Sequence, residues 1–584
     1  MRSMLNPQSR LADLEAMSDA QGLDVLVIGG GVTGAGVALD AATRGLRTGI
    51  VEAQDWASGT SSRSSKLVHG GLRYLQMLDF HLVHEALTER DLLITELAPH
   101  LVEPVAFLYP LENRVWERAY VGTGVALYDT LASVNGRRRR ALPVHRHLSR
   151  GGLAQRFPDL RHDAAIGAIQ YWDATVDDAR LVLTLVRTAA SYGALTANRT
   201  QVVSLTHSPV GAVTGAVVQD LESGEQRAIR ARHVVNATGV WTEETEALAQ
   251  SEGGLHVLAS KGVHVVVPRE KIRGDVGLIL QTEKSVLFVI PWSRYWIIGT
   301  TDTPYEFDPI HPVATRADVD YILAHANEVL AHPLTVDDVI GTYAGLRPLL
   351  QPGTKEGTSS AKVSREHTVA SPASGMTVVA GGKLTTYRVM AKDAVDFALG
   401  SRASTLPSIT DRIPLWGAEG LKAVRRQGRA LSMKHGWTRA TFDHLTHRYG
   451  SGLSDLLEQI ERQPDLAAPL EHAPAYLRAE IHFAATHEQV MHLEDVMTHR
   501  TRLVYEMADS GLAAAPEIAQ IVAAVQGWDQ ARIDREISSY RARIEADAAA
   551  AREQSEEQAT AVRATVPSIA PMMALDTAGA SDPD

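Results

Sequence analysis

The stretch LDVLVIGGGVTGAGVALDAATRGLRTGIVEA, from Leu23 to Ala53, decides the fold. It joins a short apolar run, a glycine-rich turn, an alanine-rich segment and a second apolar run, which is the pattern of a βαβ unit. Gly29, Gly31 and Gly34 form GxGxxG directly after the first run, and Glu52 closes the second. Such glycines permit a tight turn against a pyrophosphate, which the next helix receives at its N-terminus. We therefore expect a dinucleotide whose ribose hydroxyls bind Glu52.

Two later segments indicate which dinucleotide binds. VVNATGVW (Val234 to Trp241) resembles a strand that ends in small residues, and TVVAGGKLTTYRVMAKDAVD (Thr377 to Asp396) a strand, a double glycine and a helix. The second segment would bring another helix N-terminus to the same sheet, which an extended dinucleotide needs more than NAD does. No second GxGxxG is present, so a separate nicotinamide domain is not expected. The sequence favours FAD, with hydride passing directly from substrate to the flavin.

The rest of the chain divides by its hydrophobic pattern. Apolar spacing predicts helices over 82–97 and 177–192, whereas 255–305 has the pattern of strands, including KGVHVVVP and a hairpin. From about Leu406 only amphipathic helices follow, with stripes through Ile518 and Ile533. We expect the polar residues 1–22 to be loosely ordered and the tail, rich in Ala, Glu, Ser and Pro, to be disordered.

The expected fold class is α/β. A Rossmann-like FAD-binding domain of the glutathione-reductase/D-amino-acid-oxidase type is combined with a β-rich substrate domain and a C-terminal α-helical domain. The predicted boundaries are 20–100, 177–254 and 345–400 for a discontinuous FAD-binding domain, 101–176 and 255–344 for the substrate domain, 406–545 for the helical domain and 546–584 for the tail.

Composition excludes several function classes. The 584 residues include 57 Lys and Arg and 69 Asp and Glu. The resulting net charge of -12 argues against a nucleic-acid partner. The absence of cysteine excludes disulfides, cysteine nucleophiles and iron–sulfur clusters, and fits a reducing cytoplasm. The N-terminus has no apolar core of a secretory signal, and no run of 18 apolar residues predicts a transmembrane helix. Histidine spacing in the helical region predicts no metal site.

Several longer motifs carry a resemblance to a known family. In chain order they are VIGGGVTGAGVALDAATRGL, TSSRSSKLVHGGLRYLQ, NATGVW, KGVHVVVP, IIGTTDT, YAGLRPLL, VSREHTV, GGKLTTYR and HLEDVMTHRTRL. They span roughly residues 24–510, and their order and length resemble the FAD-dependent (respiratory, aerobic) glycerol-3-phosphate dehydrogenases.

The resemblance implies an activity in glycerol and glycerophospholipid catabolism. Members of this family bind FAD non-covalently and oxidise sn-glycerol 3-phosphate to dihydroxyacetone phosphate, with hydride passing from C2 to flavin N5. Electrons then go to membrane quinone, and the bacterial enzymes lie peripherally on the cytoplasmic, inner face of the cell membrane. A homodimer through the helical domain and a purely bracing role for that domain both stay open.

A phosphate substrate needs several cations, preferably arginines that form forked hydrogen bonds. Arg73, Arg347, Arg365 and Lys383 each lie beside an expected turn or strand end. The resemblance implies that Arg347 and Arg365 bind the phosphate, whereas Arg73 and Lys383 lie nearer the reacting carbinol. Tyr74 is expected either to hydrogen-bond the substrate or to pack against its neighbours.

The hydroxyl proton of the substrate needs a base with a pKa near neutrality, which is usually histidine. The two candidates are His69, directly before Gly70 and Gly71, and His264 in KGVHVVVP. We favour His69 because Arg73 belongs to the same segment. The alternative for each is a buried histidine that orients a loop or the flavin. The resemblance implies catalytic roles for His69, Arg73, Lys383 and His264.

The same motifs imply the cofactor-binding set. It comprises the fingerprint and three further segments. Its members are Gly29, Gly31, Gly34, Glu52, Ser64, Ser65, Lys66, His69, Gly70, Gly71, Ala237, Thr238, Gly239, Gly381, Gly382, Lys383 and Thr385.

Other functions remain as alternatives. A glycerol-3-phosphate oxidase would pass electrons to O2, but oxidases of the family commonly carry an insertion that is not seen between Thr301 and Arg347. A flavin amine or 2-hydroxy-acid oxidase of the same fold would need a carboxylate clamp, and a non-catalytic flavin sensor would need no substrate cations. The basic run GRRRRALPVHRH (Gly136 to His147) is either a solvated loop or a contact to anionic lipid.

Overall fold

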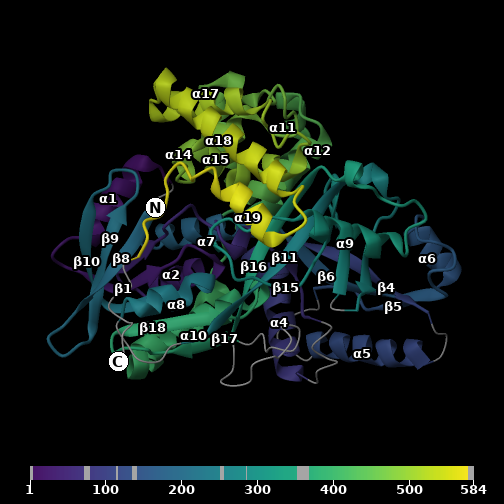
Figure 1. The fold of residues 1–584 in the computed structure, drawn as a ribbon, viewed down its shortest axis with the longest axis horizontal. Helices are drawn as coiled ribbons and strands as arrows, with labels where there is room; N and C mark the ends of the chain where they lie inside the picture. The colour runs from purple at the N-terminus through teal and green to yellow at the C-terminus, as the bar shows by residue number, and fades with distance from the viewer. Residues whose placement is uncertain are drawn as a thin grey trace.

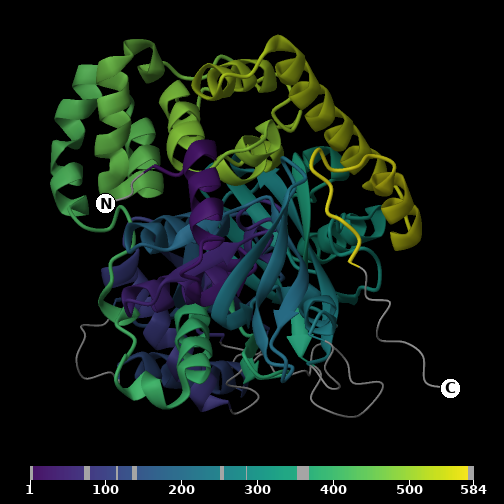
Figure 2. The same ribbon diagram turned by 90° about the vertical axis from the view of Figure 1, so that its left-hand side faces the viewer.

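The computed structural model describes residues 4–71, 79–112, 116–133, 141–249, 255–283, 286–350 and 367–575. Two sheets lie beside each other, and most of the C-terminal helices cover one side of both, as the two perpendicular views show (Figures 1 and 2). The chain crosses between the sheets several times, so segments far apart in sequence meet where the sheets adjoin.

The first sheet contains the expected βαβ unit. Strand β1 pairs in parallel with β2 on one side and β10 on the other, and helices α2 (Val32–Thr43), α7 (Asp178–Ser191) and α10 (Tyr387–Leu399) pack together against it. The predicted strand, double glycine and helix near residue 380 are confirmed as β18 and α10. In spatial order the strands are β17 (His367–Ala370), β18 (Met376–Gly381), β10 (Gln226–Asn236), β1 (Leu23–Ile28), β2 (Thr48–Val51) and β7 (Leu195–Ala197), with β8 (Thr200–His207) and β9 (Val213–Asp220) continuing antiparallel from β10.

The second sheet is mainly antiparallel. Its order is β15 (Thr303–Pro304), β11 (Val257–Pro268), β14 (Tyr295–Gly299), β13 (Val286–Trp292), β12 (Gly277–Gln281), β4 (Val102–Leu111), β6 (Gly167–Val176) and β3 (Leu67–Val68), while β16 (Gly341–Leu350) pairs with β11 and β5 (Arg146–Ser149) with β6. The predicted hairpin is confirmed as β13 and β14. The helices of this part are α4 (Phe80–Leu92), α5 (Trp116–Ser133), α6 (Arg150–Arg156) and α9 (Arg316–Asn327). The expected boundary at residue 345 falls inside β16, which belongs wholly to the second sheet.

The helical part shares its core with the second sheet. Ile518, Val522 and Tyr540 lie in the same buried cluster as Val266 and Ile297 of the sheet. The helices are α11 (Leu421–His435), α12 (Arg439–Tyr449), α13 (Leu453–Arg462), α14 (Arg478–His487), α15 (Leu493–Asp495), α16 (Leu503–Glu506), α17 (Ala515–Gln526), α18 (Gln530–Ala550) and α19 (Glu556–Ala564). Because apolar burial is the main stabilising term, these helices brace the sheets.

Buried ion pairs also join the helical part to the first sheet and its helices. Asp177, the N-cap of α7, lies 3.0 Å from Arg448 and 2.9 Å from Arg502. Arg199 pairs with Asp495 at 2.5 Å. All these side chains are buried, so each charge depends on a partner from a distant part of the chain.

Residues 4–22 are ordered, which corrects the expectation of a loosely ordered segment for this part of 1–22. Helix α1 (Pro7–Met17) begins at Asn6, whose side chain accepts a hydrogen bond from the Ser9 N–H. Buried Arg10 forms an ion pair with Asp220 at 2.5 Å. Composition alone suggested disorder, but capping and a long-range ion pair stabilise this helix.

The prediction of a disordered tail from residue 546 is wrong for residues 546–575. Helix α18 continues to Ala550, α19 covers Glu556–Ala564, and the chain is described as far as Leu575. The Glu556 carboxylate pairs with the buried Lys261 ammonium, and Arg563 lies 2.6 Å from Asp547. Polar composition misled here because these side chains find charged partners elsewhere in the fold.

Candidate active site

The glycine turn after β1 is shaped by close backbone contacts. A Cβ at Gly34 would lie 1.9 Å from the Gly29 carbonyl oxygen, so α2 packs directly on the turn. Gly29 has φ +109°, and a Cβ there would lie 2.6 Å from the Ala237 carbonyl oxygen. Side chains would therefore push apart the turn, the helix and β10. The Val32 N–H at the start of α2 donates to Ser61 Oγ at 3.0 Å.

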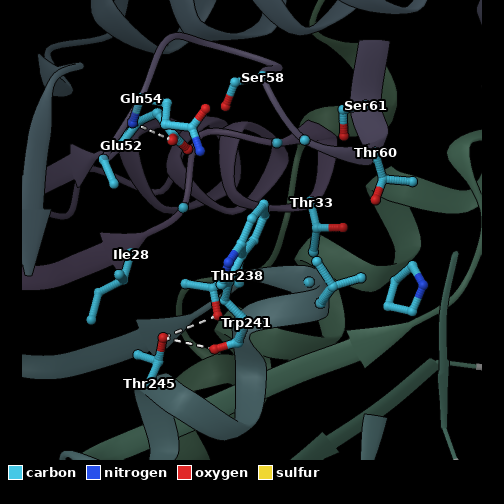
Figure 3. Close-up of a pocket in the computed structure, with 18 of the residues that line it drawn as sticks. Ile28, Thr33, Glu52, Gln54, Ser58, Thr60, Ser61, Thr238, Trp241 and Thr245 are labelled. Atoms are coloured by element: carbon cyan, nitrogen blue, oxygen red, sulfur yellow. Dashed lines mark hydrogen bonds between the residues drawn. The ribbon is translucent and has the colours of Figure 1, made fainter. Parts of the chain in front are cut away.

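Glu52 lies at the end of β2, beside this turn. Its carboxylate accepts hydrogen bonds from the N–H groups of Gly30 at 2.6 Å and Gln54 at 2.7 Å; the second is drawn in Figure 3. Burial raises the pKa of Glu52, while the two N–H donors act in the opposite direction. A carboxylate has about four acceptor positions. Glu52 therefore keeps capacity to accept ribose hydroxyls on its cavity side.

A long cavity runs from the glycine turn to the end of β18. It encloses about 1200 Å³, including solvent at its mouth. Figure 3 shows Thr33, Glu52, Gln54, Thr238 and Trp241 around it. Many of the predicted cofactor residues line it, namely Gly29, Gly31, Glu52, Ala237, Thr238, Gly239, Gly381, Gly382 and Lys383. We call this space the dinucleotide cavity.

A second, shorter cavity adjoins it. It encloses about 890 Å³ and is lined by Ser64, Ser65, His69, His264, Arg347 and Thr385, among others. The two cavities share Thr60, Pro348, Gly382, Lys383 and Leu384. The predicted histidines, Arg347 and Lys383 thus meet at one end of the dinucleotide cavity, although they come from four separate segments of chain. We call this second space the substrate cavity.

His264 on β11 is buried and held on two sides. Its Nε2 shares a hydrogen bond with Ser65 Oγ at 2.8 Å, and its ring stacks on Tyr343 with 4.8 Å between the ring centres. Its Nδ1 has no hydrogen-bond partner among the described residues. Burial, followed by the positive charges of Arg347 and Lys66, holds the pKa of His264 well below its ordinary value. The ring is therefore neutral at neutral pH.

His69 also lines the substrate cavity, in the loop after β3. Its N–H donates to Thr385 Oγ1 at 3.1 Å, and the Thr385 hydroxyl donates to the His69 carbonyl oxygen at 3.2 Å. These bonds join the loop after β3 to the loop before α10. The predicted catalytic loop and the predicted double-glycine loop therefore support one another.

Gly70 has a packing role, which corrects the expectation that its glycine admits the cofactor. A Cβ there would lie 2.5 Å from Leu87 Cδ2 and 2.6 Å from the Tyr128 hydroxyl oxygen. The Gly70 N–H donates to that hydroxyl at 2.8 Å, and Tyr128 donates to Asp173 at 2.6 Å. Neither Gly70 nor Gly71 lines the two cavities.

Arg347 on β16 is oriented before any substrate arrives. Its guanidinium donates to Asp302 at 3.2 Å, to Thr300 Oγ1 at 3.0 Å and to the Thr301 carbonyl oxygen at 3.1 Å. The hydroxyl of Ser260, which lies on strand β11, also donates a hydrogen bond to Asp302. A guanidinium fixed in this way loses little freedom when it binds an anion.

Lys66 departs from the prediction that it binds the cofactor. Its ammonium is buried and pairs with Asp178 at 2.5 Å, and it also donates to the Ser62 carbonyl oxygen at 3.0 Å. Lys66 lines neither cavity. It instead ties the loop after β2 to the start of α7, where Ser64 Oγ donates to the same Asp178 at 2.7 Å. The predicted residues Arg73, Tyr74 and Arg365 lie outside the described residues, as do the arginines at 137–140 of the basic run.

Sequence reasoning missed several lining residues. Arg63 lines the substrate cavity and Ser61 the dinucleotide cavity, and both lie within the quoted segment TSSRSSKLVHGG, whose density of polar residues was the available signal. Met572 and Leu575 also line the dinucleotide cavity. No local signal identifies them, because their position depends on how the C-terminal residues cross the first sheet.

The residues present fit FAD. The turn has no room for side chains at Gly29 and Gly34, Glu52 keeps free acceptor positions, and α2 and α10 both begin near the dinucleotide cavity. Such helix starts favour a pyrophosphate. Together with the mixed sheets, these features define a flavin-dependent oxidoreductase.

Comparison with known proteins agrees. Residues 24–388 match the FAD dependent oxidoreductase family, and residues 408–533 match the C-terminal domain of alpha-glycerophosphate oxidase. Glycerol-3-phosphate dehydrogenase of Mycobacterium leprae is 49% identical over 97% of this chain and 95% of its own. Glycerol-3-phosphate dehydrogenase 2 of Mycobacterium tuberculosis H37Rv is 50% identical over 96% and 95%.

A solved structure of glycerol-3-phosphate dehydrogenase from Bacillus halodurans, complexed with FAD, is also similar. It is 30% identical, covers 92% of this chain and 98% of its own, and superposes with a TM-score of 0.73. The chain belongs to the family of FAD-dependent glycerol-3-phosphate dehydrogenases. Within the described residues, no helix has the length and apolar character needed to span a membrane.

Proposed function

We propose that this protein oxidises sn-glycerol 3-phosphate to dihydroxyacetone phosphate and passes the electrons to a membrane quinone. The observation that carries the proposal is the junction of the two cavities. There Lys383 and Gly382 line both the long space that fits a dinucleotide and the short space that holds His69, His264 and Arg347. A small substrate in the short space lies against the end of the dinucleotide.

The phosphate of the substrate binds Arg347. A phosphate carries about two negative charges near neutral pH. Arg347 presents a guanidinium already oriented by Asp302 and the Thr300–Thr301 segment. Lys383 provides a second cation at the junction, and we assign Arg365 to the phosphate and Arg73 to the carbinol end. This charge pattern favours a phosphate over the carboxylate of an amino or hydroxy acid.

A side chain of the protein accepts the proton of the substrate hydroxyl group. When bound, FAD accepts a hydride from C2 of the substrate. We assign the hydroxyl proton to His69. His264 is the weaker base, because protonation would add a charge to a buried ring that already faces Arg347 and Lys66. We assign His264 to positioning, because Ser65 fixes its Nε2 and the residue lines the substrate cavity.

Anaerobic flavin bleaching tests the reaction. The purified protein is titrated with glycerol 3-phosphate, lactate or glycine in the absence of oxygen, and the flavin absorbance near its visible maximum is followed. Bleaching by glycerol 3-phosphate alone is expected. A protein that holds FAD but is not bleached by glycerol 3-phosphate would refute the assigned activity, and bleaching by lactate or glycine would favour the alternative oxidases.

The acceptor is tested in the same sample. The segment between Thr301 and Arg347 contains β15 and α9 without a further inserted domain, which supports the dehydrogenase over the oxidase. A water-soluble quinone added to the bleached enzyme should restore the flavin absorbance much faster than air-saturated buffer. Faster reoxidation by O2, with release of hydrogen peroxide, would assign the protein as an oxidase.

We further propose that the protein lies on the cytoplasmic face of the membrane through the basic run at 136–147. The run contains Arg137, Arg138, Arg139 and Arg140 in a chain of net charge -12. Each basic residue near an anionic surface contributes about 1 kcal/mol. Such a contact keeps the enzyme close to its quinone.

Vesicle sedimentation tests this contact. The protein should pellet with phosphatidylglycerol vesicles at low salt, but not with phosphatidylcholine vesicles or at high salt. Replacing Arg137–Arg140 with glutamine should abolish pelleting. The matched control replaces four exposed basic residues of α11, namely Lys422, Arg425, Arg426 and Arg429. Loss of binding only in the control would place the contact on α11 instead.

A further inference from the structure

The C-terminal segment returns from the helical part to the first sheet. After α19 it leaves the helices and runs along the β8 side of that sheet, where it is coloured yellow in Figures 1 and 2. The beginning of this segment is held against α19, because Arg563 donates a hydrogen bond to the Val566 carbonyl oxygen at 2.7 Å. We call residues 566–575 the C-terminal strap. The two regions of the chain that match family models end before the strap, at residues 388 and 533.

Two hydrogen bonds attach the strap to β8. The Met573 N–H donates to Gln201 Oε1 at 2.7 Å, and Gln201 Nε2 donates to the Met573 carbonyl oxygen at 2.8 Å. The side-chain amide of Gln201 thus pairs with the N–H and the C=O of a single residue, as a neighbouring strand would. The Met573 side chain takes no part in this pairing and is 49% exposed.

The residues on either side of this anchor turn inward. Met572 and Leu575 line the dinucleotide cavity, and Gln54 Nε2 lies 3.4 Å from Met572 Sδ. Gln54 follows Glu52 closely in the chain, and Gln201 and Thr200 line the same end. The strap therefore covers the end of the cavity at Glu52, opposite the junction with the substrate cavity.

We infer that the C-terminal strap is a wall of the cofactor site that covers the adenosine half of FAD and slows its release. The inference rests on the assignment of the ribose to Glu52. Two apolar side chains against an adenine remove apolar surface from water, which favours the closed arrangement. The strap is tied by few hydrogen bonds and buries little of itself, so it is among the segments that open most readily. Release of the cofactor then follows opening of the strap.

Two adjacent methionines provide a matched pair of variants. Met572→Ala removes a side chain that lines the cavity, whereas Met573→Ala removes one that faces solvent and leaves its backbone pairing intact. A third variant lacks residues 568–584 and keeps α19 with its Arg563–Val566 bond. For each holoenzyme, FAD release is measured after dilution by the rise in flavin fluorescence. Circular dichroism and the melting temperature report whether the fold is retained.

Faster release is expected where the wall is lost. The FAD off-rate should rise about 3- to 10-fold in Met572→Ala and more in the deletion, and stay within 2-fold in Met573→Ala, because a single buried apolar contact of this size has that effect on the dissociation rate. ADP binding to the apoprotein, measured by calorimetry, should weaken in the same order because the strap contacts the adenosine half. The visible flavin spectrum should be unchanged.

Three results would overturn the inference. Unchanged release in both Met572→Ala and a folded deletion would mean that the strap is not part of the site. Slower release or tighter ADP binding in the deletion would make the strap a competitor of the cofactor. Faster FAD release with unchanged ADP affinity would place the adenosine elsewhere. None of these readouts depends on glycerol 3-phosphate, so they are independent of the proposed reaction.

Discussion

Arg500 of the helical part and Asp55 of the loop after β2 form a buried, bidentate ion pair. Arg500 Nη2 lies 2.8 Å from Asp55 Oδ1, and Nη1 bonds the other carboxylate oxygen. His499 Nδ1 also lies 2.7 Å from Asp55. Burial alone would raise the pKa of Asp55, but Arg500 and His499 hold it well below its ordinary range. The carboxylate is therefore charged at any pH in which the protein works.

Trp56, the residue after Asp55, connects this ion pair to the glycine turn after β1. The Trp56 indole N–H donates to Gln489 Oε1 at 2.9 Å, and the Trp56 ring lies where a Gly30 Cβ would be only 2.5 Å from it. The helical part thus supports the dinucleotide turn from behind.

Removing Arg500 should strongly destabilise the protein. Arg500→Ala leaves the buried Asp55 carboxylate without its main partner, and the expected loss is about 3–5 kcal/mol in the free energy of unfolding. Urea unfolding followed by tryptophan fluorescence measures it. The control is Arg439→Ala, which breaks an exposed pair with Asp443 in which the arginine side chain is 93% exposed. That change should cost about 0–1 kcal/mol, and equal losses would contradict the role of burial.

Gly34→Ala should abolish FAD binding. The new Cβ would meet the Gly29 carbonyl oxygen at 1.9 Å, so either α2 or the turn must move away from the pyrophosphate position. The measurement is the flavin-to-protein absorbance ratio after purification and after reconstitution. Gly124→Ala on α5 is the control, since its Cβ meets nothing within 4 Å. Normal flavin content in Gly34→Ala would show that the turn has no such constraint.

Arg347→Ala should raise KM for glycerol 3-phosphate sharply. Loss of one buried charged contact to the phosphate corresponds to about 2–4 kcal/mol in kcat/KM. Steady-state kinetics with a soluble quinone give the value. Arg232→Ala is matched as an arginine paired with an aspartate, Asp24, but its side chain is 70% exposed and it should behave as the native protein. An unchanged KM in Arg347→Ala would remove this residue from the site.

The two histidines can be separated by pH. As the assigned base, His69 must be unprotonated for turnover, so we expect kcat/KM to fall at low pH. His69→Asn should lose about 100- to 10,000-fold in rate and also lose this acid limb. His264→Asn should be impaired but keep the limb, because burial and two neighbouring cations hold the pKa of His264 far below neutrality. Loss of the limb only in His264→Asn would reverse the assignment.

His492 should make the fold sensitive to alkali. Burial disfavours its charged form, but hydrogen bonds to Glu222 and Glu536, both at 2.9 Å, outweigh this and raise its pKa to about 9. A raised folded-state pKa stabilises the fold fully below the unfolded value of about 6.5, and this contribution disappears as the pH rises through 9. The expected loss is about 3 kcal/mol.

Melting temperatures at pH 6.5, 8 and 9.5 measure this effect. The native protein should lose stability over this range, whereas His492→Gln should start lower and show a shallower decline. Parallel declines in the two proteins would assign the pH dependence to other groups. His256→Gln serves as a control, because the His256 side chain is 76% exposed and its contact with Glu243 is long, at 3.7 Å.

Local sequence predicted those parts of the site that depend on local geometry. The turn at Gly29–Gly34 and the helix after Gly382 follow from residues within one strand–turn–helix, so their chemistry could be derived before the fold was known. The meeting of His69, His264 and Arg347 could not be derived this way. It depends on the pairing of β11 with β16 and on the bonds between His69 and Thr385.

The errors share one physical cause, which is partners distant in the chain. Lys66 lies in a segment rich in site residues, but its ammonium group forms a buried ion pair with Asp178. Gly70 appeared to admit a ligand, but Leu87 and Tyr128 occupy that space. Residues 546–575 were too polar to predict order, yet Lys261 and Gln201 hold them. In each case the deciding contact joins residues that no sequence window contains.

The buried pairs between the two matched regions limit how this family can be recombined. Asp55 and Asp177 belong to the region 24–388, whereas Arg500, Arg448 and Arg502 belong to the region 408–533. A chimaera that joins one relative's flavin region to another's helical region folds well only if both parents carry the acids and the arginines together. Substitutions at these positions are expected to arise as coupled changes, because an intermediate with one partner missing leaves a charge buried and unpaired.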